Sequence, residues 1–173
     1  MPAQQPWRPR GLFVINEYVG PDRFQWDDKT NQLMNDLLQT LPERYRIEPL
    51  TGEVRQHVGR VSVEAVVAVD PSEAIHSADI LQACAERFEL VEQREFGGAL
   101  LQFLLAEIVA NFDPDSEEDR ERLLALVETE NQLIASGELK PWFVFAVYRR
   151  AGRRARAAQT SRSTTQMPVP ALQ

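Results

Sequence analysis

The sequence predicts an α/β protein built from three strands and several helices. The clearest strand signal is Leu12–Tyr18, a run of large apolar residues that turns polar at Asn16-Glu17 and stops at Gly20-Pro21. This pattern is typical of a buried strand that delivers polar groups at its carboxyl end, where open α/β sheets bind their ligands. Two further strands are expected at Glu89–Phe96 and Trp142–Tyr148, and the segments between the strands favour helices.

The length and composition favour one domain. The chain has 173 residues, of which 43% are hydrophobic, enough for one core and too few for two comfortable domains. We divide it into an N-terminal extension (1–10), one domain (11–150) and an Arg-rich tail (151–173) whose composition predicts disorder. The last 25 residues contain six arginines and no acid, which leaves 13 basic against 26 acidic residues elsewhere, a formal charge of −13. An acidic body argues against a nucleic-acid partner.

The single cysteine and the short apolar stretches exclude several further classes of protein. Cys84 is the only cysteine, so neither an intrachain disulfide nor a thiolate metal cluster is expected, and no residue is assigned as a metal ligand. No stretch reaches the ~18 apolar residues of a membrane span, and residues 1–10 lack the apolar core of a signal peptide. We therefore expect a cytoplasmic protein without a membrane partner.

The segments after the first strand favour helices. A helix is predicted from Asp27 or Asp28, either of which can cap it, to about Leu41, with its leucines on one face. Glu43–Arg60 has no clear period and is predicted to be irregular. Val61–Val69 is compatible with a strand or with a short helix capped by its serine, and we choose the helix.

Two capping patterns and one apolar segment follow. Asp70-Pro71-Ser72-Glu73 has the residue order of a helix start, and Ser77 can cap a helix that ends near Arg87. After a turn at Gly97-Gly98, residues 99–111 are apolar nearly all round and predict one helix buried against protein. The side chains that the Ser77 helix is expected to bury are Ile80, Leu81, Cys84 and Phe88.

The last helix is predicted to start in an acidic stretch, Asp113–Asp119, because carboxylates interact favourably with the positive end of the helix dipole. It is expected to run to about Ser136 and to stop at Gly137, before the last strand. The side chains expected to face inward are Leu123, Leu124, Val127 and Ile134.

A family resemblance rests on several segments taken together. They are Leu12–Tyr18 preceded by Arg8-Pro9-Arg10-Gly11, Asn16–Pro21 with Arg23–Trp26, Asp70–Ala74, Glu89–Phe96 followed by Gly97-Gly98, Glu130–Ile134 and Trp142–Arg149. Together these segments resemble the C-terminal half of a class I S-adenosylmethionine-dependent methyltransferase. The resemblance implies a partial Rossmann-like sheet whose three strands correspond to the family's fifth, sixth and seventh. The last strand would then run antiparallel between the other two.

The chain departs from this family at the cofactor site. Family members hold S-adenosylmethionine with a glycine-rich loop after their first strand, where backbone amides without a nearby Cβ approach the ligand. Residues 1–10 are too few to contain that half, Arg10 stands where the family usually has glycine, and Gly97-Gly98 has the wrong spacing and favours a strand-to-helix turn. S-adenosylmethionine is the cofactor that the family implies, yet no cofactor-binding residue is assigned and binding by this chain alone is not expected.

The candidate substrate-binding residues cluster after the first strand. Asn16, Glu17 and Tyr18 would lie at the carboxyl edge of the sheet, where a carboxylate can orient an acceptor or take its proton. The alternative for Glu17 is a hydrogen bond to the adjacent loop. The other candidates are Arg23, Gln25, Trp26 and His76. Trp26 is also compatible with a hydrophobic anchor, and His76 with a surface residue; no catalytic residue is assigned.

The function predicted from the resemblance is the substrate-side half of a methyltransferase, truncated and inactive alone, so whether the chain is an enzyme by itself stays open. The alternative is a non-catalytic interaction or oligomerisation module derived from such an enzyme. The expected partners are a missing N-terminal half or further copies of the chain, because one edge of Leu12–Tyr18 would lack its neighbour.

Overall fold

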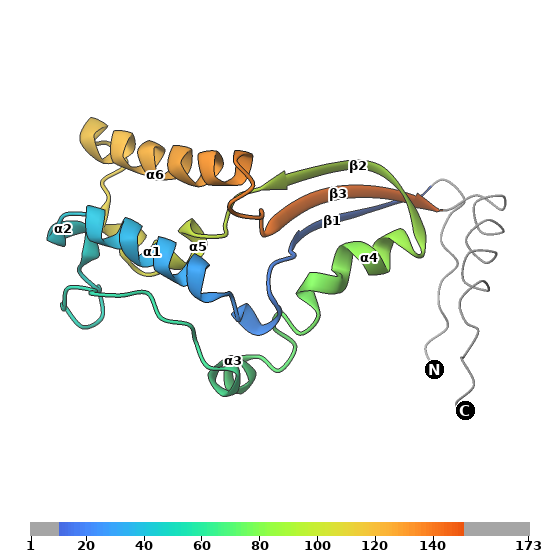
Figure 1. Ribbon diagram of the computed structural model, residues 1–173, viewed down its shortest axis with the longest axis horizontal. Coiled ribbons are helices and arrows are strands. Elements are labelled where there is room, and N and C mark those ends of the chain that lie inside the picture. The colour runs from blue at the N-terminus through green and yellow to red at the C-terminus, as the bar shows by residue number, and fades with distance from the viewer. Residues whose placement is uncertain (1–10, 151–173) are drawn as a thin grey trace, which may run out of the picture.

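Three strands form an open sheet in the computed structural model, which describes residues 11–150. β1 (Leu12–Tyr18), β2 (Phe88–Phe96) and β3 (Phe143–Arg150) lie in the order β1-β3-β2, and β3 is antiparallel to both neighbours. Figure 1 shows the sheet extending from a group of helices, with α4 along one of its faces. The predicted strands and the central, antiparallel last strand are therefore confirmed. The predictions for residues 1–10 and 151–173 lie outside the described residues.

The segments between the strands contain helices, as predicted, although several of the helices are short. The helices are α1 (Asp28–Thr40), α2 (Glu43–Arg46), α3 (Val63–Val69), α4 (Ile80–Ala85), α5 (Leu101–Leu104) and α6 (Glu117–Ala135), with 3₁₀ turns at Asp22–Phe24, Ser77–Asp79 and Ile108–Asn111. Side chains cap three of them, and the caps of α1 and α3 are those that the sequence predicts. Asp27 accepts from the Thr30 amide, and the serines before α3 and α6 accept from backbone amides in the same way. The stretch predicted to be irregular contains α2 and one isolated bridge, Ile47 to Val54.

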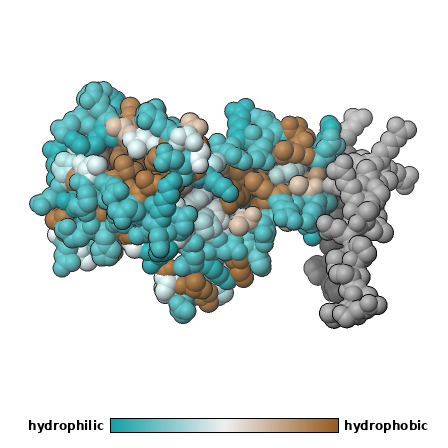
Figure 2. Space-filling model, viewed as in Figure 1, coloured by the Kyte–Doolittle hydropathy of each residue, from teal (hydrophilic) through white to brown (hydrophobic). Residues whose placement is uncertain are grey.

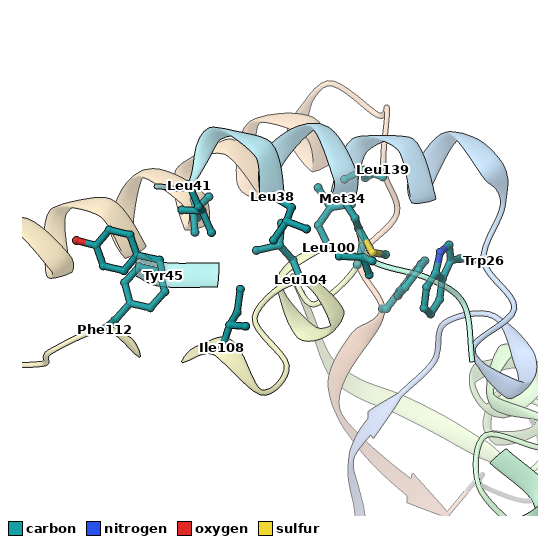
Figure 3. Close-up of a cluster of buried hydrophobic side chains, with 14 residues drawn as sticks. Trp26, Met34, Leu38, Leu41, Tyr45, Leu100, Leu104, Ile108, Phe112 and Leu139 are labelled. Atoms are coloured by element: carbon teal, nitrogen blue, oxygen red, sulfur yellow. The ribbon is translucent and has the colours of Figure 1, made fainter. Parts of the chain in front are cut away.

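The larger of two hydrophobic cores lies among the helices. α1 contributes Met34 and Leu38, which are fully buried, and they lie near Leu100 and Leu104 from the segment after β2 (Figure 3). The same core includes Trp26 and the stacked pair Tyr45 and Phe112. This core fixes the helices that follow β1, and therefore the direction in which β1 ends.

The smaller core lies between α4 and one face of the sheet. Ile15, Ala146 and Tyr148 are buried on that face, and Cys84 of α4 packs against them. Because side chains alternate along a strand, the neighbouring residues of β1 point to the opposite face. Leu12 and Val14 are 60% and 51% exposed there. One face of the sheet is thus covered by a helix, and the other keeps exposed apolar side chains.

The helix start predicted at Asp70-Pro71-Ser72-Glu73 is wrong. The Asp70 carboxylate accepts from both the amide and the hydroxyl of Ser72, at 2.7 Å each, and this local turn replaces the first helical turn. Ser77 is not a cap either, since its hydroxyl donates to the Gly20 carbonyl at 2.9 Å, and the following amide donates to Asp22 instead. Residues 70–76 therefore form a loop, and α4 starts only after the 3₁₀ turn.

The single helix predicted for residues 99–111 is also wrong. The segment forms α5 and a 3₁₀ turn, separated by Glu107, whose φ is 68°. Arg55 compensates for the break, because its guanidinium donates to the carbonyls of Phe103, Leu104 and Ala106. Leu104 and Ile108 are nevertheless fully buried, so the predicted burial of this segment is confirmed.

The inward face predicted for α6 is partly wrong. Leu124 and Val127 are 66% and 43% exposed, whereas Leu126 is buried. The buried side of the helix includes two carboxylates, Asp119 and Glu130, which hydropathy assigns to the surface. The predicted stop is confirmed, since Gly137 has a φ of +78° immediately after the helix.

Figure 2 shows hydrophobic side chains gathered over α3, away from both cores. Only Val66 of this helix is buried, while Val63, Val67 and Val69 are exposed. The backbone on the two sides of α3 accepts hydrogen bonds from Gln25, at Val61, and from Arg23, at Pro71 and Glu73.

Candidate functional site

A cavity of about 350 Å³ lies at the carboxyl end of β1, between that strand and the loop 70–76. The cavity is lined by Glu17, Tyr18, Asp70, Ser72, Glu73, Ala74, Ile75, His76, Ser77 and Ile80. It therefore brings together three candidates from the sequence, Glu17, Tyr18 and His76, from two segments that are far apart in the chain. The lining contains carboxylates and hydroxyls but no lysine or arginine. Such a cavity suits a small molecule with an amine or hydroxyl group.

Arg23 holds the loop 70–76 against the end of β1. Its backbone amide donates to the Ala74 carbonyl at 2.7 Å, and its guanidinium donates to the carbonyls of Pro71 and Glu73 at 2.8 Å each. Gln25 acts similarly on the preceding segment, because its side-chain amide donates to the Val61 carbonyl at 2.9 Å. The structure thus places Arg23 in the support of the cavity wall and Gln25 beside the segment that precedes α3, and neither residue lines the cavity.

The backbone on both sides of this contact adopts an unfavourable conformation. Arg23, Phe24 and Ala74 have φ angles of 53°, 58° and 46°. Residues other than glycine seldom occupy this region, at a cost of about 1 kcal/mol or more each, and in folded proteins they concentrate at ligand-binding and catalytic sites. The strained backbone therefore lies around the cavity and supports its assignment as the candidate site.

Tyr18 forms one wall of the cavity with its ring. Its hydroxyl donates to the Pro21 carbonyl at 3.1 Å, and its ring contacts Phe24 and Phe143 edge-on. Burial, reinforced by the nearby Asp22 and Glu73 carboxylates, raises the pKa of Tyr18 well above its ordinary value. Tyr18 therefore stays protonated at neutral pH and acts as a rigid wall and a hydrogen-bond donor, not as a base.

The titratable groups at the mouth of the cavity are exposed. Nδ1 of His76 lies 3.5 Å from Oδ2 of Asp79, and both side chains are largely exposed. Hydrogen bonds from Ser72 hold the pKa of Asp70 below its ordinary value, so this carboxylate stays charged near neutral pH. Glu17 is exposed at the carboxyl end of β1. The cavity therefore presents negative charge to any ligand.

The last two candidates lie elsewhere. Trp26 is 2% exposed and belongs to the helical core, where its indole donates to the Asn31 side chain at 3.1 Å. This is the hydrophobic-anchor alternative given by the sequence. Asn16 is exposed on β1, in register with Phe145 of β3, and does not line the cavity.

The turn at Gly97-Gly98 is closed by a carboxylate of the chain itself. Glu130 accepts from the amides of Gly98, Leu100 and Leu101, at 2.9, 2.7 and 3.2 Å. A Cβ on Gly97 would lie 2.1 Å from Oε2 of Glu130, so the carboxylate fills the space beside the glycine. The donors that a glycine-rich loop offers to a ligand are therefore already used here. This agrees with the strand-to-helix turn that the sequence favours.

The metal-ligating and thiol side chains of residues 11–150 include the single cysteine, Cys84, and both histidines. No group of three or more histidine, cysteine, aspartate and glutamate side chains could hold a metal ion in this part of the chain. Cys84 is buried, and burial raises the pKa of its thiol, which makes it a poor nucleophile. None of the described helices is long and apolar enough to cross a membrane.

Seven lining residues were not among the sequence candidates, and three of them, Asp70, Ser72 and Glu73, were missed because their order matched a helix start. The aspartate two positions before a serine is also the pattern of a local side-chain turn, and that signal could have placed them in a loop. Glu130 was recognised only as part of a resembling segment, since nothing in its immediate sequence indicates three amide donors.

The architecture of residues 11–150 is that of a mixed helix and strand protein with an open three-stranded antiparallel sheet. No protein-family model, curated protein or solved structure matches this chain.

Proposed function

We propose that this chain is the substrate-side half of a methyltransferase-like domain and that the cavity at the end of β1 holds the methyl acceptor. The observation that carries the proposal is the position of this cavity. It lies at the carboxyl end of a strand whose sheet has the order β1-β3-β2 with an antiparallel central strand. The resemblance implies this order for the last three strands of the family's sheet.

The residues that line the cavity suit the acceptor's part of the reaction. Methyl transfer by in-line displacement depends mostly on positioning, and the acceptor loses a proton. Glu17 would orient an amine or hydroxyl group and accept that proton, while the Tyr18 ring and Ile80 hold an apolar part. S-adenosylmethionine supplies the methyl group when it is bound, and we assign its binding to residues outside 11–150 or to another polypeptide.

Calorimetry of the purified chain tests whether it binds an acceptor and does not bind S-adenosylmethionine. Tyramine is a suitable probe because it joins an amine to a phenol of a size that fits the cavity. We expect tyramine to bind with a dissociation constant on the order of a millimolar, and S-adenosylmethionine to give no heat. Glu17→Gln should weaken tyramine binding about fivefold or more, whereas Glu89→Gln, far along the sheet, should leave it unchanged. Micromolar binding of S-adenosylmethionine, or tyramine binding that ignores Glu17→Gln, would contradict the proposal.

A second candidate function is a non-catalytic interaction module. It is favoured by β1, which among the described residues pairs with β3 alone and so leaves one edge of the sheet open. Two variants distinguish these two candidate functions. A change at Val14 on the open edge should impair association and leave tyramine binding intact, whereas Glu17→Gln should do the reverse.

A further inference from the structure

The two outer edges of the sheet differ in how they are protected against pairing. β2 has a bulge between Leu90 and Glu92, and its sequence includes four charged residues between Glu89 and Glu95. β1 pairs with β3 in unbroken register from Leu12 to Tyr18 and has one charged residue, Glu17. Bulges and charges are the features by which natural sheets prevent edge-to-edge association. β2 has both of these features, and β1 is a regular strand with almost none.

The hydrogen bonding of β1 shows which of its residues face the open edge. The amide of Val19 donates to the Trp142 carbonyl, so Val19 directs its backbone groups toward β3. Backbone groups alternate in direction along an antiparallel strand, so Ile15 and Glu17 also bond to β3. The residues whose N–H and C=O groups point outward are therefore Leu12, Val14, Asn16 and Tyr18.

We propose that the open edge of β1 pairs antiparallel with β1 of a second copy, about a two-fold axis at Ile15. This register places Leu12 opposite Tyr18 of the other copy and Val14 opposite Asn16. All four outward-facing residues then form hydrogen-bonded pairs, with about eight N–H···O bonds in total. If the register shifted by one residue, each residue whose backbone groups point outward would lie opposite a residue whose backbone groups point toward β3. These hydrogen bonds would then be lost. The strand is therefore complementary to itself over its whole length.

The side chains and charges are compatible with this arrangement. Glu17 would lie opposite Phe13 of the other copy, so no two like charges face each other directly. Leu12 and Val14, which are exposed on the uncovered face, would gain cross-strand neighbours. A strand of seven residues makes a small interface, and small interfaces associate weakly. We expect a monomer–dimer equilibrium at roughly tens of micromolar.

This inference is independent of the proposed acceptor site and deepens the second candidate function, because it names the partner of the open edge. It requires only the edge of β1, and it would stand if the cavity bound no acceptor. Failure of tyramine binding and failure of dimerisation are therefore separate results.

The test measures the mass of the full chain in solution by sedimentation and light scattering between about 1 and 200 μM. Val14 and Val91 offer a matched pair of variants, since they are 51% and 52% exposed on β1 and β2. Val14→Lys should raise the dissociation constant at least tenfold, whereas Val91→Lys should change it less than twofold. Circular dichroism checks that both variants keep the wild-type fold.

Amide hydrogen exchange tests the register, and it needs no variant. Raising the protein concentration should slow the exchange of the amides of Val14, Asn16 and Tyr18, whereas those of Ile15 and Glu17 are protected at every concentration. Three results would overturn the proposal: a monomer at all concentrations, a dimer equally sensitive to Val91→Lys, or concentration-dependent protection confined to residues outside β1.

Discussion

β1 and β2 end at the same end of the sheet, because both are antiparallel to β3, yet the chain completes the two ends differently. At the end of β2, the buried carboxylate of Glu130 accepts hydrogen bonds from three backbone amides. At the end of β1, Glu17 and His76 border an open cavity. In this sheet, a strand's carboxyl end is therefore a candidate site only where the chain leaves polar groups available to a ligand.

Removal of the Glu130 carboxylate at the end of β2 is expected to destabilise the protein most. Glu130→Ala should lower the free energy of unfolding by about 3 kcal/mol, because three largely buried amides lose a charged acceptor. Urea denaturation measures the change. Glu128→Ala, on the exposed side of the same helix, should change the free energy of unfolding by less than about 0.5 kcal/mol. Equal stability of the two variants would remove the structural role assigned to Glu130.

A second prediction separates backbone strain from crowding at the same turn. Gly98 and Gly137 have φ angles of +80° and +78°, but a Cβ on Gly98 would lie 2.4 Å from the Phe143 ring, while nothing lies within 4 Å at Gly137. Gly137→Ala should cost about 1 kcal/mol for the left-handed backbone alone. Gly98→Ala should cost about 2 to 3 kcal/mol, since the ring must also move. Equal losses in thermal unfolding would show that Phe143 does not confine this turn.

A third prediction concerns the end of β1, which borders the cavity. Arg23→Ala removes the two side-chain bonds to the loop 70–76 and should cost about 1 kcal/mol of stability. Hydrogen exchange of the loop amides should accelerate while that of β3 stays unchanged. Arg87→Ala, which loses one exposed bond to the Ala83 carbonyl, is the control. Unchanged loop exchange in the Arg23 variant would mean that other contacts hold the cavity wall.

Glu17→Gln is expected to change the stability of the protein least. Glu17 is exposed, so its replacement should change the free energy of unfolding by less than about 0.5 kcal/mol. A larger loss in urea denaturation would give Glu17 a structural role like that of Glu130 and would remove the contrast between the two ends.

The sequence predicts the regular elements well and the irregular ones poorly. β1 and α1 follow from apolar pattern and capping, which are local signals. Residues 70–76 were misassigned because capping residues also favour side-chain turns, and the competition is decided by distant contacts such as those from Arg23. The inward face of α6 was partly misassigned because its buried positions include carboxylates whose amide partners are remote in sequence.

The candidate site was predictable in its position and less so in its composition. Glu17, Tyr18 and His76 were identified from the strand end and from residue type, and all three line the cavity. Asp70 and Glu73 were missed with the loop that contains them. Arg23 was identified as a candidate, but its role depends on carbonyl groups about 50 residues away, which no local pattern indicates.

Amide chemical-shift mapping by NMR, with tyramine added to the chain at millimolar concentration, tests the contrast between the two strand ends most directly. We predict shifts at Tyr18, Ala74 and His76 and none at Gly98, Leu100 or Leu101. Shifts at the Gly98 turn with none around β1 would contradict the account, because they would show that the end closed by Glu130 is the one that binds ligands.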